Sequence, residues 1–330
     1  MDKNEKDLYA YRVYGMEKAF RDLPKEGAKE RFEHIKYFAN IGIEHIQGYT
    51  QYQRDNTMYY IFTHHTAGDY GYIMIANGMD CTKETVIRTP KGYNHPAGVQ
   101  CVGQYLFVPC ENKDGGSSIL IYDLMNLTPM GTASYIENQH IKKINFTHRA
   151  GCLGITDYQS NGKRYYIMAV GANEVYHVYR AEVDEEMLKK NFANISFNKV
   201  GSFSLKDVKI KELEDNGSTR EEVRTIDCQG MVLATDGNDE AVYMVAPVLR
   251  GADDWVYLFR LNIGDSSVSA TPILGRHMIC CGGIIGHSGI HYRWGTGIRI
   301  RPQNKLVVLA TARNCLPAWD ADLDTNHWNH

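Results

Sequence analysis

HPAGVQCVGQYLFVPCE, residues 95–111, is the stretch of sequence that decides the fold. Two apolar runs flank the short turn Gly103-Gln104, which is the pattern of a β-hairpin. The hairpin begins with His95-Pro96 and ends with Glu111, although strands favour β-branched and aromatic residues. The polar residues at its two ends therefore need an explanation other than strand formation.

Four other segments align with this hairpin on one glycine. They are HIQGYTQYQRDNTMYYIFTHH (45–65), HRAGCLGITDYQSNGKRYYIMAVG (148–171), DCQGMVLATDGNDEAVYMVAPV (227–248) and YRWGTGIRIRPQNKLVVLATA (292–312). Each has a small or polar start, the glycine, a short strand, a polar turn and an apolar strand. Such a repeat indicates a repeated supersecondary unit, and the turn residues favour a hairpin in each copy.

Further strand patterns follow most of the hairpins, so each unit contains about four strands, which is typical of a β-propeller blade. The sequence predicts an all-β fold, a single five-bladed propeller with four-stranded blades spanning residues 1–330. The blade cores are expected near residues 45–90, 95–136, 148–205, 227–281 and 292–324. A strand at residues 8–15 is expected to complete the last blade and close the ring. Short helices are expected within residues 16–38, 184–192 and 207–224, and a β-sandwich is the alternative fold.

Composition limits the classes of partner. The chain has 330 residues and a formal net charge of −3, which gives no reason to expect nucleic acid or an anionic membrane. An apolar run long enough to cross a bilayer is lacking, and the start MDKNEKDLYAYRVYG has no apolar signal core, so a cytoplasmic protein is expected. The eight cysteines form no CxxC pair, and the neighbours Cys280 and Cys281 are interpreted as packing residues. The oligomeric state has no signature in the sequence.

The residues three positions before the aligned glycines have side chains that can bind metals or transfer protons. They are His45, His95, His148, Asp227 and Tyr292. In a propeller the first strand of each blade lines the axis and the second strand returns antiparallel, so the start of one and the end of the other share one mouth. The ends of the second strands add His64, His65, Glu111 and Arg313, and Gln47, Arg149, Gln229, His291, Arg293 and Trp294 are adjacent.

Three interpretations of this mouth remain open. In the first, His45, His95 and His148 bind a divalent transition metal such as zinc, iron, copper or manganese. In the second, histidines perform acid–base catalysis without a metal. In the third, the polar ring only holds ordered water or a ligand and plugs the channel. The predicted catalytic residues are Glu111, Asp227, His64 and Tyr292, and the predicted substrate-binding residues are Arg149, Arg293, Trp294, Gln47 and Gln229.

The five repeated units resemble the five-bladed architecture of arabinanase- and fructosidase-like glycosidases and of tachylectin-type lectins. HPAGVQ and YRWGTG also resemble motifs, HPxGxQ and RWGxG, of a group of propeller proteins without an assigned activity. The glycosidase resemblance implies acidic residues at the mouth on successive blades. This chain instead has histidines at the first three equivalent positions, with acids only at Asp227 and Glu111.

Taken together, the pattern predicts an enzyme that acts on a small polar or sugar-like substrate by hydrolysis, elimination or oxidation. Arginine forks suit carboxylates, so Arg149 and Arg293 are expected to hold an anionic substrate group. The alternative is a non-catalytic propeller module that binds a glycan or a protein.

Overall fold

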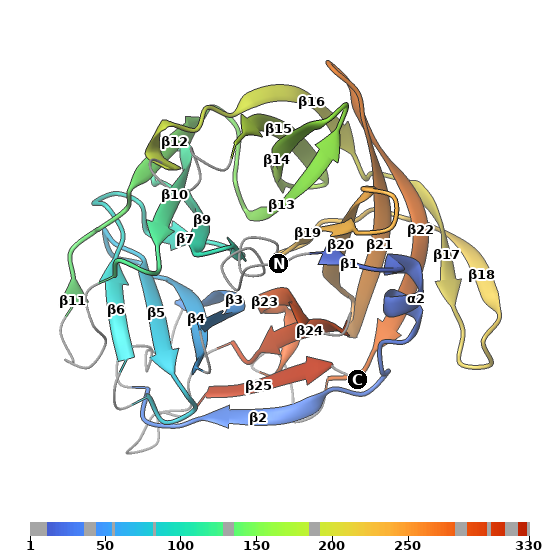
Figure 1. Cartoon of the computed structure of the whole chain (residues 1–330). Helices are drawn as coiled ribbons and strands as arrows, with labels where there is room; N and C mark the ends of the chain where they lie inside the picture. The colour runs from blue at the N-terminus through green and yellow to red at the C-terminus, as the bar shows by residue number, and fades with distance from the viewer. Residues whose placement is uncertain are drawn as a thin grey trace.

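The computed structural model is a five-bladed β-propeller, in which four-stranded antiparallel sheets surround a common axis (Figure 1). It describes residues 12–35, 44–54, 57–81, 84–127, 135–184, 192–280, 289–301, 305–313 and 323–328. No helix within these ranges is long and apolar enough to cross a membrane.

The blades follow the chain, and each begins with its inner strand. Blade 1 comprises β3 (His45–Arg54), β4 (Thr57–His65), β5 (Tyr72–Asn77) and β6 (Glu84–Arg88). Blade 2 comprises β7 (His95–Pro96) with β8 (Gln100–Val102), then β9 (Tyr105–Glu111), β10 (Ser117–Asp123) and β12 (Lys142–Phe146). Blade 3 comprises β13 (Cys152–Ser160), β14 (Lys163–Ala172), β15 (Val175–Val183) and β16 (Asn198–Ser204). Blade 4 comprises β19 (Val232–Asp236), β20 (Val242–Arg250), β21 (Asp253–Ile263) and β22 (Val268–Met278). Blade 5 comprises β23 (His291–Arg301), β24 (Lys305–Thr311), β25 (Leu323–Trp328) and β2 (Ala28–Phe32).

Among the described residues, six short elements lie outside the blades. They are β1 (Arg12–Val13), α2 (Met16–Arg21), β11 (Tyr135–Ile136), η2 (Phe192–Asn194), β17 (Val208–Leu213) and β18 (Thr219–Arg224).

Four of the five aligned glycines lie against residues of another blade, whereas Gly151 lies against Ala172 of its own blade. A Cβ on Gly98 would lie 2.6 Å from the carbonyl oxygen of Gln229, and one on Gly230 would lie 2.3 Å from Oγ1 of Thr296. Only glycine permits such close approach near the axis. At four of its five positions, the glycine repeat in the sequence therefore marks a contact between blades.

The buried side chain of Gln100 connects inner strands of three blades. Gln100 donates a hydrogen bond from Nε2 to the carbonyl of Leu233, 2.9 Å away, and its Oε1 accepts bonds from the amides of Ile155 and Leu233. One amide thus connects blades 2, 3 and 4, and the polar groups it buries are satisfied.

The ring closes with a different N-terminal strand from the one that the sequence predicts. Of residues 8–15, positions 8–11 lie outside the described residues, and β1 pairs with β19 of blade 4. The last blade is completed by β2, which pairs antiparallel with β25. The Lys- and Glu-rich segment 16–38 looks helical, but within residues 16–35, the part that the structure describes, only α2 is a helix. Lys29 and Arg31 project from the same face of β2 and form ion pairs with the buried Asp324.

The segment 207–224 is a hairpin rather than the helix that the sequence predicts. Strands β17 and β18 pair antiparallel, and β17 also pairs with the outer edge of β22 (Figure 1). Alternate side chains of β17 point to the same face of the strand. Ile210 and Glu212 share such a face, and both are buried. Arg224, Arg250 and the Tyr257 hydroxyl all bind the Glu212 carboxylate, which explains how a charged residue is buried there. Positions 185–191 of the other predicted helix lie outside the described residues.

Blade 2 extends further along the chain than its expected end at residue 136. Its outer strand is β12, which pairs with β10, while β11 pairs in parallel with β6 of blade 1. Residues 130–134 of the expected blade lie outside the described residues, and Tyr135–Ile136 join the neighbouring blade instead.

Candidate functional site at one mouth of the propeller

Polar side chains of blades 1 and 2 meet at one end of the axis. His45, at the start of β3, lies opposite His65, at the end of β4. His95, at the start of β7, lies opposite Glu111, at the end of β9. This register matches the arrangement that the sequence predicts, and we call this end of the propeller the mouth.

A pocket of about 350 Å³ opens at the mouth. It is lined by His45, Gln229, Arg293, Trp294 and Arg313. These residues come from the units of blades 1, 4 and 5, and the sequence assigns all of them to this mouth. The volume is in the range of sites that bind small molecules.

The pocket is rich in positive charge. The guanidinium carbons of Arg293 and Arg313 lie 5.3 and 5.2 Å from the centre of the Trp294 ring, as in cation–π pairs. Among the described residues that line the pocket, none is a carboxylate. An anionic ligand would therefore find two guanidinium groups positioned around one aromatic ring.

Three imidazole rings pack together beside this pocket. The ring of His65 lies 5.2 Å from that of His45 and 4.8 Å from that of His95, and both contacts are edge-to-face. His45 also packs edge-to-face on Trp294, at 5.3 Å. The histidine cluster of the mouth is thus His45, His65 and His95.

The side chain of Gln47 connects two of these rings. Its amide nitrogen lies 2.5 Å from Nε2 of His45 and 2.7 Å from Nε2 of His95. An amide nitrogen can only donate, so in this arrangement both Nε2 atoms face the Gln47 amide as acceptors. Gln47 is buried, and it orients the histidines rather than being exposed for a substrate.

Glu111 extends this chain of hydrogen bonds. Nδ1 of His95 lies 3.1 Å from one carboxylate oxygen, and Arg149 donates to both oxygens at 2.9 and 2.8 Å. Burial by itself raises the Glu111 pKa, but the hydrogen bonds from His95 and Arg149 outweigh it and lower the pKa to about 2. Glu111 is therefore ionised at neutral pH, and the Arg149 fork is engaged by this carboxylate.

His64, which the sequence predicts to be catalytic, is buried, whereas its neighbour His65 is not. His64 is 1% exposed, whereas His65 belongs to the cluster at the mouth. Burial, followed by the proximity of His45 and His65, lowers the His64 pKa to about 3. The catalytic assignment of His64 therefore requires correction, because neighbouring strand residues point to opposite faces and His65 faces the site.

His148 is held within its own blade. Its ring stacks on His177 at 3.8 Å, and its Nε2 lies 2.7 Å from the hydroxyl of Tyr179. The described coordinates do not bring ligand atoms of His45, His95 and His148 within 4.8 Å of one another. A transition metal shared by these three histidines stays a prediction of the sequence.

Tyr292 does not reach the mouth. Its side chain is fully buried in the main apolar core, and its ring packs 5.3 Å from that of Trp328. Burial raises the pKa of the hydroxyl well above its usual value. The assignment of Tyr292 as a catalytic residue is corrected accordingly: β23 has a register shift between His291 and Thr296, and His291, rather than Tyr292, pairs with Thr311 at the end of β24.

Asp227 lies at the rim of the mouth. It is exposed, and one of its oxygens accepts a hydrogen bond from the backbone amide of Asn173, 3.1 Å away. Its charge also contributes to raising the Arg149 pKa, after the larger effect of Glu111. The residue is thus near the Glu111–Arg149 pair and outside the pocket lining.

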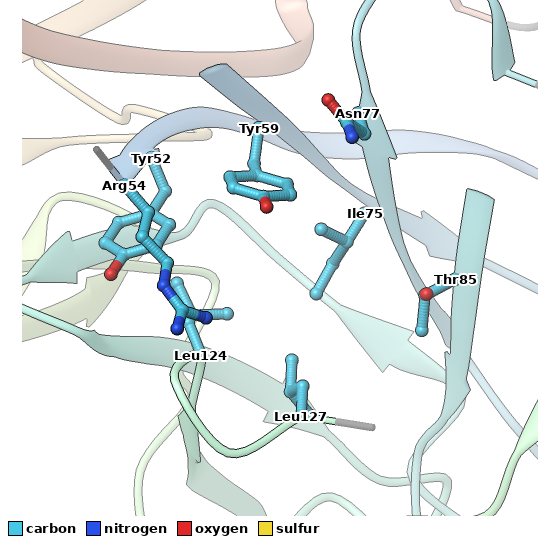
Figure 2. A pocket seen from close by; sticks show the side chains of 8 residues that line it. All are labelled: Tyr52, Arg54, Tyr59, Ile75, Asn77, Thr85, Leu124 and Leu127. Carbon is cyan, nitrogen blue, oxygen red and sulfur yellow. The ribbon is translucent and has the colours of Figure 1, made fainter. Parts of the chain in front are cut away.

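A second pocket, of about 310 Å³, lies at the opposite end of blade 1 (Figure 2). Its lining comprises Tyr52, Arg54, Tyr59, Ile75, Asn77, Thr85, Leu124 and Leu127. Figure 2 shows the Tyr59 ring and the Ile75 side chain between Arg54 on one side and Thr85 on the other. Arginine is the only charged type in this lining, so acid–base chemistry is better supported at the mouth.

Comparison with solved structures finds distant propeller glycosidases. The catalytic domain of the GH62 α-L-arabinofuranosidase of Coprinopsis cinerea is 10% identical, with 98% of each chain covered and a TM-score of 0.45. The α-L-arabinofuranosidase of Podospora anserina, solved with cellotriose, is 9% identical, with 97% of each chain covered and a TM-score of 0.43. The GH43_1 enzyme from Xanthomonas citri is 10% identical, covering 93% of this chain and 92% of its own, at a TM-score of 0.38. No protein-family model and no curated protein sequence matches the chain. Similarity at these TM-scores carries no argument about activity, which must come from the site.

Proposed function

We propose that the mouth pocket is the substrate site of an enzyme acting on a small, sugar-like substrate that carries a carboxylate. The observation that carries the proposal is the placement of Arg293 and Arg313 around Trp294, in a pocket without an acidic lining residue. Guanidinium forks bind carboxylates through paired hydrogen bonds. Trp294 offers an apolar ring edge or face to the ligand, and Gln229 offers an amide to its hydroxyl groups.

The state of Glu111 favours elimination over hydrolysis by two carboxylates. Glycoside hydrolysis of that type needs one carboxylic acid that is protonated near neutral pH. Glu111 has a pKa of about 2 and is bound by Arg149, so it cannot serve as this acid. Elimination next to a carboxylate needs a base and cations that stabilise the negative charge formed when the proton leaves. The pocket contains an imidazole and two arginines for these tasks.

His45 is the residue that would accept the proton, because it is the imidazole in the pocket lining. The acceptor atom is Nε2, to which the Gln47 amide donates in the structure. A substrate would have to displace that amide. As Nε2 takes the proton from the carbon next to the carboxylate, the C=C bond forms, the C–O bond on the following carbon breaks, and the leaving oxygen takes a proton from water. The proposal needs no metal, although Lewis-acid assistance is compatible with it.

The proposal is tested by measuring binding of galacturonate oligomers and of the matching neutral galactose oligomers by calorimetry. We expect the acidic sugar to bind at least about tenfold more tightly, and Arg293→Ala to weaken its binding about 10- to 100-fold, since a charge-assisted hydrogen bond contributes about 1.5–3 kcal/mol. The matched control is Arg260→Ala, an arginine paired with Asp239 on blade 4, which should bind like the parent protein.

Turnover is measured on the same samples by the near-ultraviolet absorbance of an unsaturated uronate product. His45→Ala should abolish turnover while binding persists. Tight binding without any turnover by the parent protein would instead support the non-catalytic binding module. Equal binding of acidic and neutral sugars would overturn the proposal.

A further inference from the structure

Asp254, Cys280 and His291, three side chains of types that bind metal ions, lie at the mouth end of the propeller, where blades 4 and 5 meet. Asp254 is the second residue of β21 and lies opposite Met278, near the end of β22. Cys280 follows two residues later, and His291 is the first residue of β23. The three side chains thus come from the end of one blade and the start of the next.

Their ligand atoms converge. One carboxylate oxygen of Asp254, the Cys280 sulfur and one ring nitrogen of His291 all lie within 4.8 Å of one another. Within the residues that the structure describes, no other three histidine, cysteine or acidic residues meet this criterion. Asp254 is 3% exposed, while Cys280 and His291 are half-buried and leave one side of the group accessible.

Asp254 holds the geometry of this group. One carboxylate oxygen accepts the backbone N–H of Tyr292 at 2.7 Å, and the other lies 2.9 Å from Nδ1 of His291. In a tetrahedral zinc site with bonds of about 2.0–2.2 Å, oxygen and nitrogen ligands lie about 3.3 Å apart. An ion could therefore replace the proton between Asp254 and His291 with a shift of a few tenths of an ångström.

We infer that Asp254, Cys280 and His291 form a site for a zinc-class divalent ion beside the mouth pocket. A thiolate with an imidazole selects zinc and similar borderline-soft metals over calcium and magnesium, which prefer oxygen ligands alone. Three protein ligands leave a fourth position for water or a substrate atom, as in catalytic zinc sites. The site is two residues along the chain from Arg293, which lines the pocket. This inference is independent of the proposed function.

The test is cobalt titration of the purified, metal-stripped protein, because a thiolate bound to cobalt gives a charge-transfer band in the near ultraviolet. We expect about one equivalent of cobalt to produce the band and zinc to displace it. Cys280→Ser should abolish the band and weaken zinc binding at least about tenfold. Cys281→Ser, the neighbouring cysteine, and His95→Ala, in the histidine cluster, are matched controls that should retain the band.

A second readout separates metal loss from misfolding. Zinc bound to the native state raises the unfolding temperature, because only the folded protein assembles the ligands. The parent protein and Cys281→Ser should show this shift, whereas Cys280→Ser and His291→Ala should lack it while retaining the β circular dichroism of the parent. Absence of the cobalt band in the parent protein, or its persistence in Cys280→Ser, would overturn the inference.

Discussion

At the scale of single residues, Glu111 shows how a buried charge is stabilised at the mouth. Its two oxygens take part in three hydrogen bonds with His95 and Arg149, both of which follow from the aligned repeat. Removing one partner of such a pair leaves the other group without its counter-charge. We therefore assign Glu111 and Arg149 the role of orienting His95, which in turn shares Gln47 with His45.

The low pKa of Glu111 makes this pair sensitive to acid. The pKa is about 2 in the folded protein against 4.5 for the free side chain, so the ionised pair stabilises the fold above about pH 4.5. That contribution is lost as the pH falls from about 4.5 to 2. Glu111→Gln should lower the free energy of unfolding by about 1–3 kcal/mol at pH 7, and the difference from the parent should shrink below pH 4.

Urea unfolding at several pH values measures this difference. The control is Glu221→Gln, which replaces an exposed glutamate on β18. It should change the free energy of unfolding by less than about 0.5 kcal/mol at both pH 7 and pH 3. A Glu111→Gln difference that is the same at pH 7 and pH 3 would contradict the low pKa.

At the scale of elements, the inner strands of the first and last blades meet with almost no space between them. A Cβ on Gly297 of β23 would lie 1.7 Å from the carbonyl oxygen of Tyr49 on β3. The same two strands share one ladder pair, Thr296 with Gly48. The second glycine of the motif YRWGTG is thus required by the contact that joins the end of the ring to its start.

Gly297→Ala should therefore push β23 away from β3. Overpacking of a core costs about 1–3 kcal/mol, and a clash with backbone atoms belongs at or above the upper end of that range. We expect a loss of at least about 3 kcal/mol in urea unfolding, or a marked loss of soluble protein. Gly68→Ala is the matched control, because a Cβ there would lie 3.4 Å from its nearest neighbour, Oγ1 of Thr66, which is an ordinary contact. A loss of stability in Gly68→Ala as large as in Gly297→Ala would argue against the clash.

At the scale of the whole molecule, the repeat in the sequence predicts the ring and the mouth, because both depend on local patterns. Each hairpin shows its glycine, turn and apolar strand directly. Closure by β2 is not visible in this way, since the Lys- and Glu-rich segment becomes a strand only when Asp324, almost 300 residues away, lies beside it. The β17–β18 hairpin is mistaken for a helix for the same reason, because its buried Glu212 depends on Arg250, a residue of blade 4 that lies 38 positions away in the sequence.

The site follows the same division. The repeat correctly brings His45, Arg293 and Trp294 to one pocket, because the first residues of the inner strands of blades 1 and 5 lie at the same mouth. It fails for His64 and Tyr292, where a strand's alternation and a bulge decide which side chain faces the mouth. The group around Cys280 has no motif spacing, and only the fold brings Asp254 and His291 to it.

Closure of the ring can be tested through Phe32, the last residue of β2. Its ring packs 5.1 Å from that of Phe62 in blade 1, so this side chain joins the last blade to the first. Phe32→Ala should cost about 3–5 kcal/mol, and hydrogen exchange should accelerate at the amides of β25 more than in blade 3. Phe203→Ala removes a ring that packs 5.5 Å from that of Tyr176 within blade 3. It should accelerate hydrogen exchange in blade 3 more than at the amides of β25. If Phe32→Ala leaves the protection of β25 unchanged relative to blade 3, then β2 does not hold the ring closed, and the last blade is stabilised by its other three strands.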